Sequence, residues 1–200
     1  MLAHRQPRLF KHREYLALEQ ASETRSEYYQ GQIFAMTGGT VEHNQIVRNL
    51  TLELGLALRG GPCQVFVTDL RLFIATHDLF TYPDLFVVCG PLARLEGRSD
   101  TLTDATLVVE VLSPSTEVYD RGEKFLFYQS LPSLAEYLLV SQQPRVERRT
   151  RTGPGEWHTS LFQQLDQSLE LASVGVTLKL ADIYREVELS RTTQERAAQE

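Results

Sequence analysis

The residues best suited to chemistry are two carboxylates inside apolar, strand-like segments: Asp84 in TYPDLFVVC and Glu110 in ATLVVEVLS. An unpaired carboxylate in a protein core costs several kcal/mol or takes up a proton, so each position needs a reason. If the two strands are neighbours in one sheet, the carboxylates converge and repel each other unless a cation or a proton lies between them. Mg²⁺ prefers such ligands, often one or two carboxylates with water and substrate phosphate. The pattern therefore predicts a divalent-metal site that acts on phosphate esters.

Lys124 is the third candidate, on a helical stretch that follows the Glu110 strand. About eight residues of helix run back roughly 12 Å, which brings the lysine within reach of Glu110. Spacing alone leaves two alternatives open. Lys124 extends to solvent and pairs with Asp120, four residues earlier on the same stripe. For the two acids, the other interpretation is that Asp84 caps a turn after Pro83 and Glu110 faces solvent at a strand end.

Several further polar residues lie where they would support or extend such a site. His43 begins the apolar stripe of a helix and either hydrogen-bonds towards the site, which we favour, or only donates to a backbone carbonyl. Asp69 interrupts a strand and either lines the site, pairs with Arg71 or turns outwards. Glu42 either adds a metal ligand or only complements the helix dipole. These further candidates are His43, Asp69, Glu42, Glu27, Ser113 and Asp120, with Ser115 a possible phosphate contact beside Ser113.

The elements that must position these residues follow from periodicity and turn signals. The spacing predicts short helices and hairpin strands first, then a packed helix, three strands, a second helix, a strand and a final antiparallel region. The expected ranges are a helix at 11–19, two strands in 27–36 around Gln30-Gly31, a helix at 41–59, strands at 63–75, 81–89 and 105–113, a loop at 91–104, a helix at 116–130 capped by Ser113 or Ser115, a strand at 136–141 and later strands turning at 153–155 and around Ser173. This order predicts an α/β or α+β domain with a mixed sheet flanked by helices.

Composition narrows the class of protein. With 200 residues, 42% hydrophobic and 23% charged, the chain is typical of one globular domain. No apolar run approaches a membrane helix, and the first residues show no signal-peptide pattern, so we expect a cytoplasmic protein. Cys63 and Cys89 match no zinc spacing and are expected to be reduced, small core residues. The net charge of −6 counts against non-specific binding of nucleic acid by charge alone.

One basic cluster, Arg145, Arg148, Arg149 and Arg151, either contacts a phosphate backbone or lies on a solvated strand face. The solvated face is the interpretation that we favour. Trp157 and Phe162, in the later strands, are expected in the core or an interface rather than stacked on nucleic-acid bases.

A longer set of motifs carries a family resemblance. EHNQIVRNL, VTDLRLFI, TYPDLFVV and LVVEVLSPSTEVYDRGEKFLFYQSLPSLAEYLLVS closely resemble the Uma-type family of endonucleases, within the PD-(D/E)XK restriction-endonuclease-like superfamily. The resemblance covers about residues 27–184. A Pro-Asp pair alone is weak evidence for this family. Highly specific evidence comes from the combination of Glu-Val-Leu-Ser-Pro-Ser-Thr, the downstream Asp and Lys, and Glu-Tyr-Leu-Leu-Val.

The resemblance implies an αβββαβ core and hydrolysis of DNA phosphodiester bonds that depends on Mg²⁺, with Mn²⁺ as the alternative ion, in a homodimer. Pro83-Asp84 corresponds to the superfamily's Pro-Asp and Glu110 to its second acid. The superfamily pattern has a lysine two residues later, where this chain has Leu112, so Lys124 on the next helix takes that role. Asp84 and Glu110 would then hold the metal, while Lys124 orients the attacking water.

The expected organisation is an N-terminal helical extension at 1–26, the nuclease-like domain at 27–188 and a polar tail at 189–200. Fold does not establish activity, so two other functions stay open. One is a catalytically silent binding or scaffolding protein on a nuclease fold. The other is hydrolysis of RNA or another phosphoester at the same metals.

Overall fold

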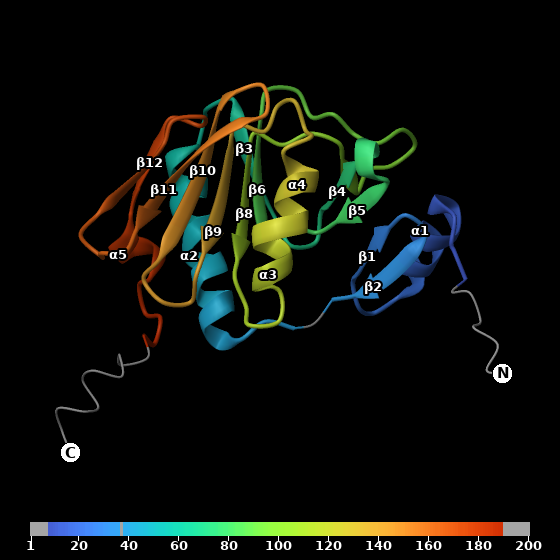
Figure 1. Ribbon diagram of the computed structural model, residues 1–200, viewed down its shortest axis with the longest axis horizontal. Coiled ribbons are helices and arrows are strands. Elements are labelled where there is room, and N and C mark those ends of the chain that lie inside the picture. The colour runs from blue at the N-terminus through green and yellow to red at the C-terminus, as the bar shows by residue number, and fades with distance from the viewer. Residues whose placement is uncertain (1–7, 37, 190–200) are drawn as a thin grey trace, which may run out of the picture.

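A computed structural model describes residues 8–36 and 38–189 (Figure 1). Its centre is a six-stranded mixed sheet in the order β11-β10-β9-β8-β6-β3. Only β8 and β9 run parallel; the other neighbours in this sheet are antiparallel. The strands are β3 (Cys63–Val67), β6 (Leu85–Cys89), β8 (Leu107–Val111), β9 (Glu136–Val140), β10 (Val146–Gly153) and β11 (Glu156–Phe162).

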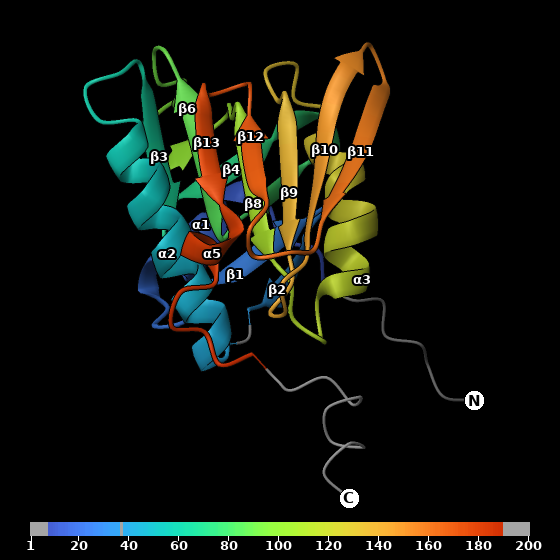
Figure 2. The ribbon, with the colours of Figure 1, turned by 90° about the vertical axis from the view of Figure 1, so that its left-hand side faces the viewer.

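Helix α2 (Val41–Ala57) covers one face of this sheet, together with the hairpin of β12 (Ser168–Leu171) and β13 (Val176–Lys179) and the short helix α5 (Leu180–Ile183) (Figure 2). Ile46, Leu50 and Leu54 of α2 are fully buried here. Burying each such side chain contributes about 1.5–3 kcal/mol, which explains the three-and-four spacing.

The opposite face carries α3 (Glu117–Tyr119), a π-helical turn η2 (Asp120–Lys124) and α4 (Phe125–Tyr128), which run on as one helix. Alternation along the strands divides the core between the two faces. Val108 and Leu112 of the β8 segment pack with Phe127 and Tyr128 of α4. Glu110 alternates with these apolar residues and therefore points to the same face.

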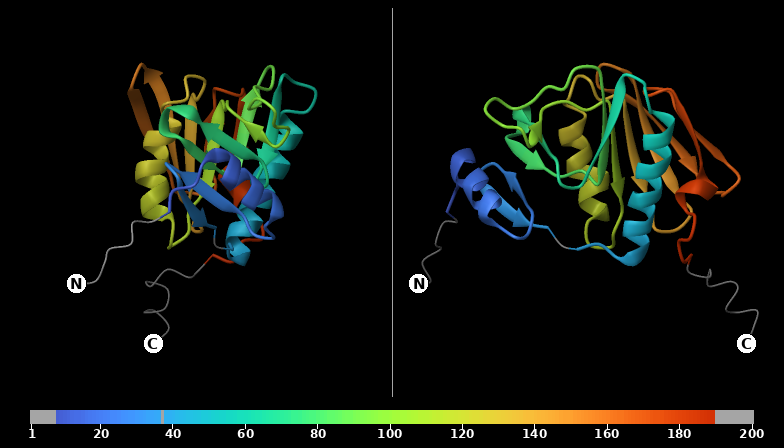
Figure 3. Two further views of the ribbon diagram at one scale, coloured as in Figure 1. Left: turned by 90° about the vertical axis from the view of Figure 1, so that its right-hand side faces the viewer. Right: turned by 180° about the vertical axis from the view of Figure 1, so that it is seen from behind.

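A second, five-stranded sheet in the order β2-β1-β5-β4-β7 lies on the α3–α4 side of the molecule, with α1 (His12–Ala21) packed on it (Figure 3). Tyr15, Tyr28 and Phe80 form its buried centre. The strands are β1 (Ser26–Tyr29), β2 (Gln32–Ala35), β4 (Arg71–Ile74), β5 (Leu79–Thr81) and β7 (Thr101–Leu102), and a 3₁₀ turn η1 (Ala75–His77) joins β4 to β5.

The α/β fold with a central mixed sheet, the αβββαβ order and the late antiparallel strands are confirmed, but two expected strands are wrong as single elements. The segment 63–75 divides into β3 and β4, and 81–89 divides into β5 and β6. Each half pairs in a different sheet, because the chain crosses between the sheets at 68–70 and at 82–84. Pro83 has no N–H to donate to a ladder, which favours a break there. The expected loop at 91–104 also contributes β7.

The second flanking helix begins close to where it is expected, but its cap differs. Its N-cap is Thr116, and neither Ser113 nor Ser115 caps it with a side chain. Instead the Ser113 carbonyl accepts hydrogen bonds from the backbone N–H groups of Thr116 and Glu117. The serine hydroxyls bond to each other at 3.0 Å.

The expectation of reduced cysteines is also wrong. Cys63 and Cys89 are directly opposite each other in the β3–β6 ladder and form a disulfide. Both are half-buried against the α2-side core, so their expected packing holds while their expected redox state does not. Most of the tail predicted from residue 189, and the first seven residues of the predicted extension, lie outside the described residues.

Candidate active site

Asp84 lies one residue before β6 rather than within it, in the bend after Pro83. Its Oδ2 accepts a hydrogen bond from the Val111 backbone N–H at 2.8 Å. His43 Nε2 lies 3.3 Å from the same oxygen. The carboxylate is therefore fixed against β8 and against the start of α2.

His43 owes its position to the N-terminus of α2. The side chain of the N-cap Thr40 accepts a hydrogen bond from the His43 backbone N–H at 3.1 Å, as a helix cap does. A Cβ on Gly39 would lie 2.8 Å from the imidazole Nδ1, so a glycine is needed where the chain passes the ring. The hydrogen bond to Asp84 raises the pKa of His43 despite its burial.

Glu110 is only 2% exposed, on the α3–α4 face of β8. Its Oε1 accepts hydrogen bonds from Lys124 Nζ at 3.0 Å and from the Tyr128 hydroxyl at 2.8 Å. Its Oε2 accepts from the Asp84 backbone N–H at 3.4 Å. Burial raises the pKa of Glu110, the charge of Lys124 opposes that shift, and Asp120 and Asp84 reinforce it.

Lys124 joins three carboxylates. Its Nζ lies 3.0 Å from Glu110, 3.4 Å from Glu27 and 3.5 Å from Asp120. The wider π-helical turn places Asp120 and Lys124 side by side on the sheet, and such turns are frequent at functional sites. Burial by itself lowers the pKa of Lys124, but the charges of Glu110 and Glu27 raise it well above its usual value. Lys124 thus pairs with Asp120 inside the protein and not at its surface.

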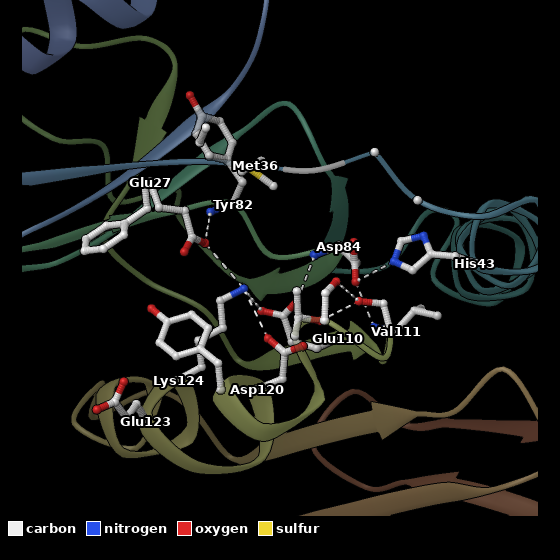
Figure 4. Close-up of a pocket in the computed structure, with 18 of the residues that line it drawn as sticks. Glu27, Met36, His43, Tyr82, Asp84, Glu110, Val111, Asp120, Glu123 and Lys124 are labelled. Atoms are coloured by element: carbon white, nitrogen blue, oxygen red, sulfur yellow. Dashed lines mark hydrogen bonds and ion pairs between the residues drawn. The ribbon is translucent and has the colours of Figure 1, made fainter.

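These side chains line one cavity of about 480 Å³ (Figure 4). Asp84, Glu110 and Lys124 share it with Glu27 and Asp120. Glu27 arrives from β1, where its Oε1 accepts hydrogen bonds from the Thr81 hydroxyl and the Tyr82 backbone N–H. Both sheets therefore contribute to the site.

Negative charge exceeds positive charge in this cavity. Four buried or half-buried acids line the cavity together with one lysine and one histidine. The four acids are Glu27, Asp84, Glu110 and Asp120. Two carboxylates with room for water and phosphate suit Mg²⁺ or Mn²⁺. Among residues 8–36 and 38–189, no group of three His, Cys, Asp or Glu side chains is arranged as a ready metal cage. The donor set would suit a hard divalent ion that keeps several waters, and Asp84 and Glu110 are the residues that could hold it.

Other candidates lie away from these contacts. Asp69 sits in the turn between β3 and β4 with 81% of its side chain exposed, and Arg25 Nε lies 3.4 Å from it. It does not line the cavity, because the crossing between sheets turns it outwards. Glu42 does not line the cavity either, whereas Ser113 and Ser115 do.

Three arginines of the basic cluster bind other groups of the protein. Arg149 lies over the Phe125 ring and donates to the Arg121 carbonyl, and Arg151 donates to the carbonyls of 129, 131 and 134. Arg148 donates to the Glu170 carbonyl. A solvated face is therefore the wrong description of these three guanidinium groups. Trp157 and Phe162 pack against the core, as expected.

Sequence reasoning missed the apolar and aromatic lining of the cavity. The main such residues are Tyr29, Phe34, Met36, Tyr82 and Tyr119. A signal was present, because Ile33 and Phe34 are consecutive in a short strand. Consecutive large apolar residues point to opposite faces, so both faces of that strand had to meet something.

The fold defines a restriction-endonuclease-like protein. A crystal structure described as a putative nuclease belonging to DUF820, from Anabaena variabilis, is similar with a TM-score of 0.68. The match covers 82% of this chain and 91% of that chain at 18% identity, so it speaks for the fold alone.

The family follows from the sequence comparison. Residues 12–181 match the model of the Uma2 family, described as "Putative restriction endonuclease", and the chain belongs to that family. An uncharacterized protein of Synechocystis sp., slr1290, is 39% identical over 173 residues, covering 86% of this chain and 90% of the relative. A second one, sll1609, is 35% identical over 145 residues, covering 72% and 82%. None of the helices in the described part of the chain is long and apolar enough to cross a membrane.

Proposed function

We propose that this protein is a metal-dependent endonuclease that hydrolyses DNA phosphodiester bonds, with Mg²⁺ or Mn²⁺ held by Asp84 and Glu110. The observation that carries the proposal is that Asp84, Glu110 and Lys124 line one cavity, from the bend before β6, from β8 and from η2. Family membership supports a nuclease; the metal and the DNA substrate are inferred from the chemistry of the side chains.

The roles follow from the contacts. A bound divalent ion would polarise a phosphoryl oxygen and lower the pKa of a coordinated water. Glu110 accepts a hydrogen bond from the Asp84 backbone N–H, and both carboxylates line one cavity. Lys124 offers an ammonium group beside them, suited to orient the attacking water and to stabilise the negative charge that develops on phosphorus oxygens. His43 holds the Asp84 carboxylate in place and acts as a positioning residue.

The test is cleavage of supercoiled plasmid and of single- and double-stranded DNA and RNA, with Mg²⁺, Mn²⁺ or EDTA. Asp84→Asn and Glu110→Gln should abolish metal-dependent cleavage while the variants stay folded. Glu156→Gln, which changes an exposed acid on β11, is the matched control and should cleave like wild type. Cleavage retained in either site variant rejects the assignment.

The main alternative is a binding or scaffolding protein without turnover, which the net charge of −6 favours. Binding without cleavage of any substrate in the same assay would support it, and cleavage of RNA alone would assign a ribonuclease. We also propose a homodimer, acting in the cytoplasm. Sedimentation tests the dimer. The Cys63–Cys89 disulfide counts against the cytoplasm, because disulfides are uncommon in cytosolic proteins. Alkylation of thiols in intact cells tests the compartment: two free thiols support the cytoplasm, and an oxidised pair overturns it.

A further inference from the structure

One wall of the cavity is apolar and comes from the β1–β2 hairpin and the chain just after it. Phe34 and Met36 line this wall with 48% and 37% of their surface exposed. Figure 4 shows Met36 across the cavity from Lys124 and Asp120. In the described part of the chain, neither Phe34 nor Met36 belongs to a hydrophobic cluster, whereas the neighbouring Ile33 packs with Tyr15 and Tyr28. Exposed apolar side chains at a cavity indicate contact with a ligand.

The reactive groups are almost completely buried in the described part of the chain, and they line this cavity. Glu110, Asp120 and Lys124 are 2%, 3% and 6% exposed. A cavity of about 480 Å³ lies in the size range of sites for single small ligands. A B-DNA duplex is far larger, since its major groove alone is about 12 Å wide. A phosphate group reaches Glu110 most readily when its nucleotide leaves the base stack or belongs to a single strand.

The charge of the residues that line the cavity also bears on how a nucleic acid binds there. Its lining includes five carboxylates, the four acids named above and Glu123, against Lys124 and His43. The guanidinium groups of Arg149 and Arg151 are bound to backbone carbonyls and aromatic rings. A duplex and a single strand are both held by lysine and arginine along the backbone, so this acidic lining favours contact through a base over contact through a run of phosphates. Proteins that bind single strands add aromatic side chains on which bases stack, which suits the Phe34 wall.

We infer that the cavity takes one unstacked nucleotide of single-stranded or locally unpaired DNA. Its base lies against Phe34 and Met36, and its phosphate lies towards Asp84, Glu110 and Lys124. The identity of the ligand rests on the proposed function, while the apolar wall is an independent observation.

The test measures binding by fluorescence anisotropy of full-length protein in Ca²⁺, with three labelled DNA probes: a single strand, its perfect duplex and a duplex with a central unpaired loop. Phe34→Ala removes the ring, and Phe34→Trp keeps an aromatic surface. Leu161→Ala changes an apolar residue of β11 that is 44% exposed and does not line the cavity, and serves as the control. Met36→Ala is a second wall variant should Phe34→Ala not fold.

Single-stranded and looped probes should bind at least ~10-fold more tightly than the duplex. Phe34→Ala should weaken their binding roughly 10-fold, the order measured when a stacking ring is removed. Phe34→Trp and Leu161→Ala should bind like wild type. Equal or tighter binding of the duplex, or unchanged binding by folded Phe34→Ala, overturns the inference.

Cleavage of the same probes in Mg²⁺ separates this inference from the proposed function. Duplex cleavage that Glu110→Gln abolishes, together with equal affinity for all three probes, overturns the unstacked nucleotide and leaves the endonuclease standing. Absence of cleavage of every probe, together with Phe34-dependent binding of the single strand, overturns the endonuclease and supports the nucleotide cavity.

Discussion

The carboxylates of Asp84 and Glu110 each accept a backbone hydrogen bond at, or next to, the other residue. Oδ2 of Asp84 accepts the N–H of Val111, the residue after Glu110, and Oε2 of Glu110 accepts the N–H of Asp84. Between these bonds, Leu85 and Val109 are partners in the β6–β8 ladder. The relative position of the two carboxylates is therefore set by the pairing of β6 with β8 and by these two hydrogen bonds, which is the kind of rigid support that a catalytic site needs.

Replacing Lys124 by Met should destabilise the protein by about 3 kcal/mol, because three buried carboxylates lose their shared cation. The free energy of unfolding in urea, without divalent ions, measures this. Lys179→Met, at an exposed position of β13, is the control and should change little. Glu110→Gln should cost less than Lys124→Met, since it removes one acid from a group in which acids are in excess. A Lys124→Met protein as stable as wild type would contradict this account of the cluster.

Mg²⁺ should stabilise the folded protein even without substrate, because the excess of carboxylates in the cavity favours a cation. At a free Mg²⁺ concentration ten times its dissociation constant the gain is about 1.4 kcal/mol. Thermal unfolding with Mg²⁺, compared with NaCl at equal ionic strength, measures it. Asp84→Asn should remove most of the gain and Glu156→Gln should retain it. An equal gain in wild type and Asp84→Asn would place the ion elsewhere.

Local pattern was sufficient to predict the central sheet, but it left two positions open for Lys124, one beside Glu110 and one at the surface with Asp120. Val and Leu runs mark buried strands, and the helical rise limits where Lys124 can reach. The crossings at 68–70 and 82–84 depend on which sheet each half-strand pairs with, which a local pattern does not contain. Asp69 was ambiguous for that reason, since its direction is decided by the crossing.

The disulfide and the apolar cavity wall depend on contacts between distant segments. Cys63 and Cys89 meet only because β3 and β6 pair in one register, and a slip of one residue would part them. Phe34 reaches the cavity only because its hairpin packs beside β5. Its place on a short strand was predicted from the sequence, but its exposure and its contact with the cavity were not.

Asn49 should be the residue that holds the C-terminal segment on α2. It is fully buried, and its Nδ2 donates to the carbonyls of Ile183 and Arg185 at 2.9 and 2.8 Å. Asn49→Ala leaves both carbonyls without this donor and should destabilise the fold by about 1–3 kcal/mol. Urea unfolding measures the loss, with Asn44→Ala, at an exposed position of the same helix, as the control. Equal stability of the two variants would show that the segment is held by apolar packing alone.

Glu147 should make the free energy of unfolding depend on pH in the acid range. Its carboxylate binds Arg121 of η2 at 2.6 Å and Arg149 of β10 at 2.7 Å, and so ties the turn that carries Lys124 to the sheet. Burial by itself raises the pKa of Glu147, but the hydrogen bonds and charges of Arg149 and Arg121 outweigh it and lower the pKa below its usual value of 4.5.

A folded pKa below the unfolded one means that the ionised carboxylate stabilises the protein above pH 4.5, and that this contribution disappears as the pH falls through the folded pKa. The difference in free energy of unfolding between wild type and Glu147→Gln should therefore be constant near neutral pH and shrink in acid. Urea unfolding over a series of pH values measures it. Glu156→Gln, exposed on the neighbouring strand, should show a much smaller difference throughout. A wild-type advantage that grows on acidification would mean that Glu147 is not held as an ion by the two arginines.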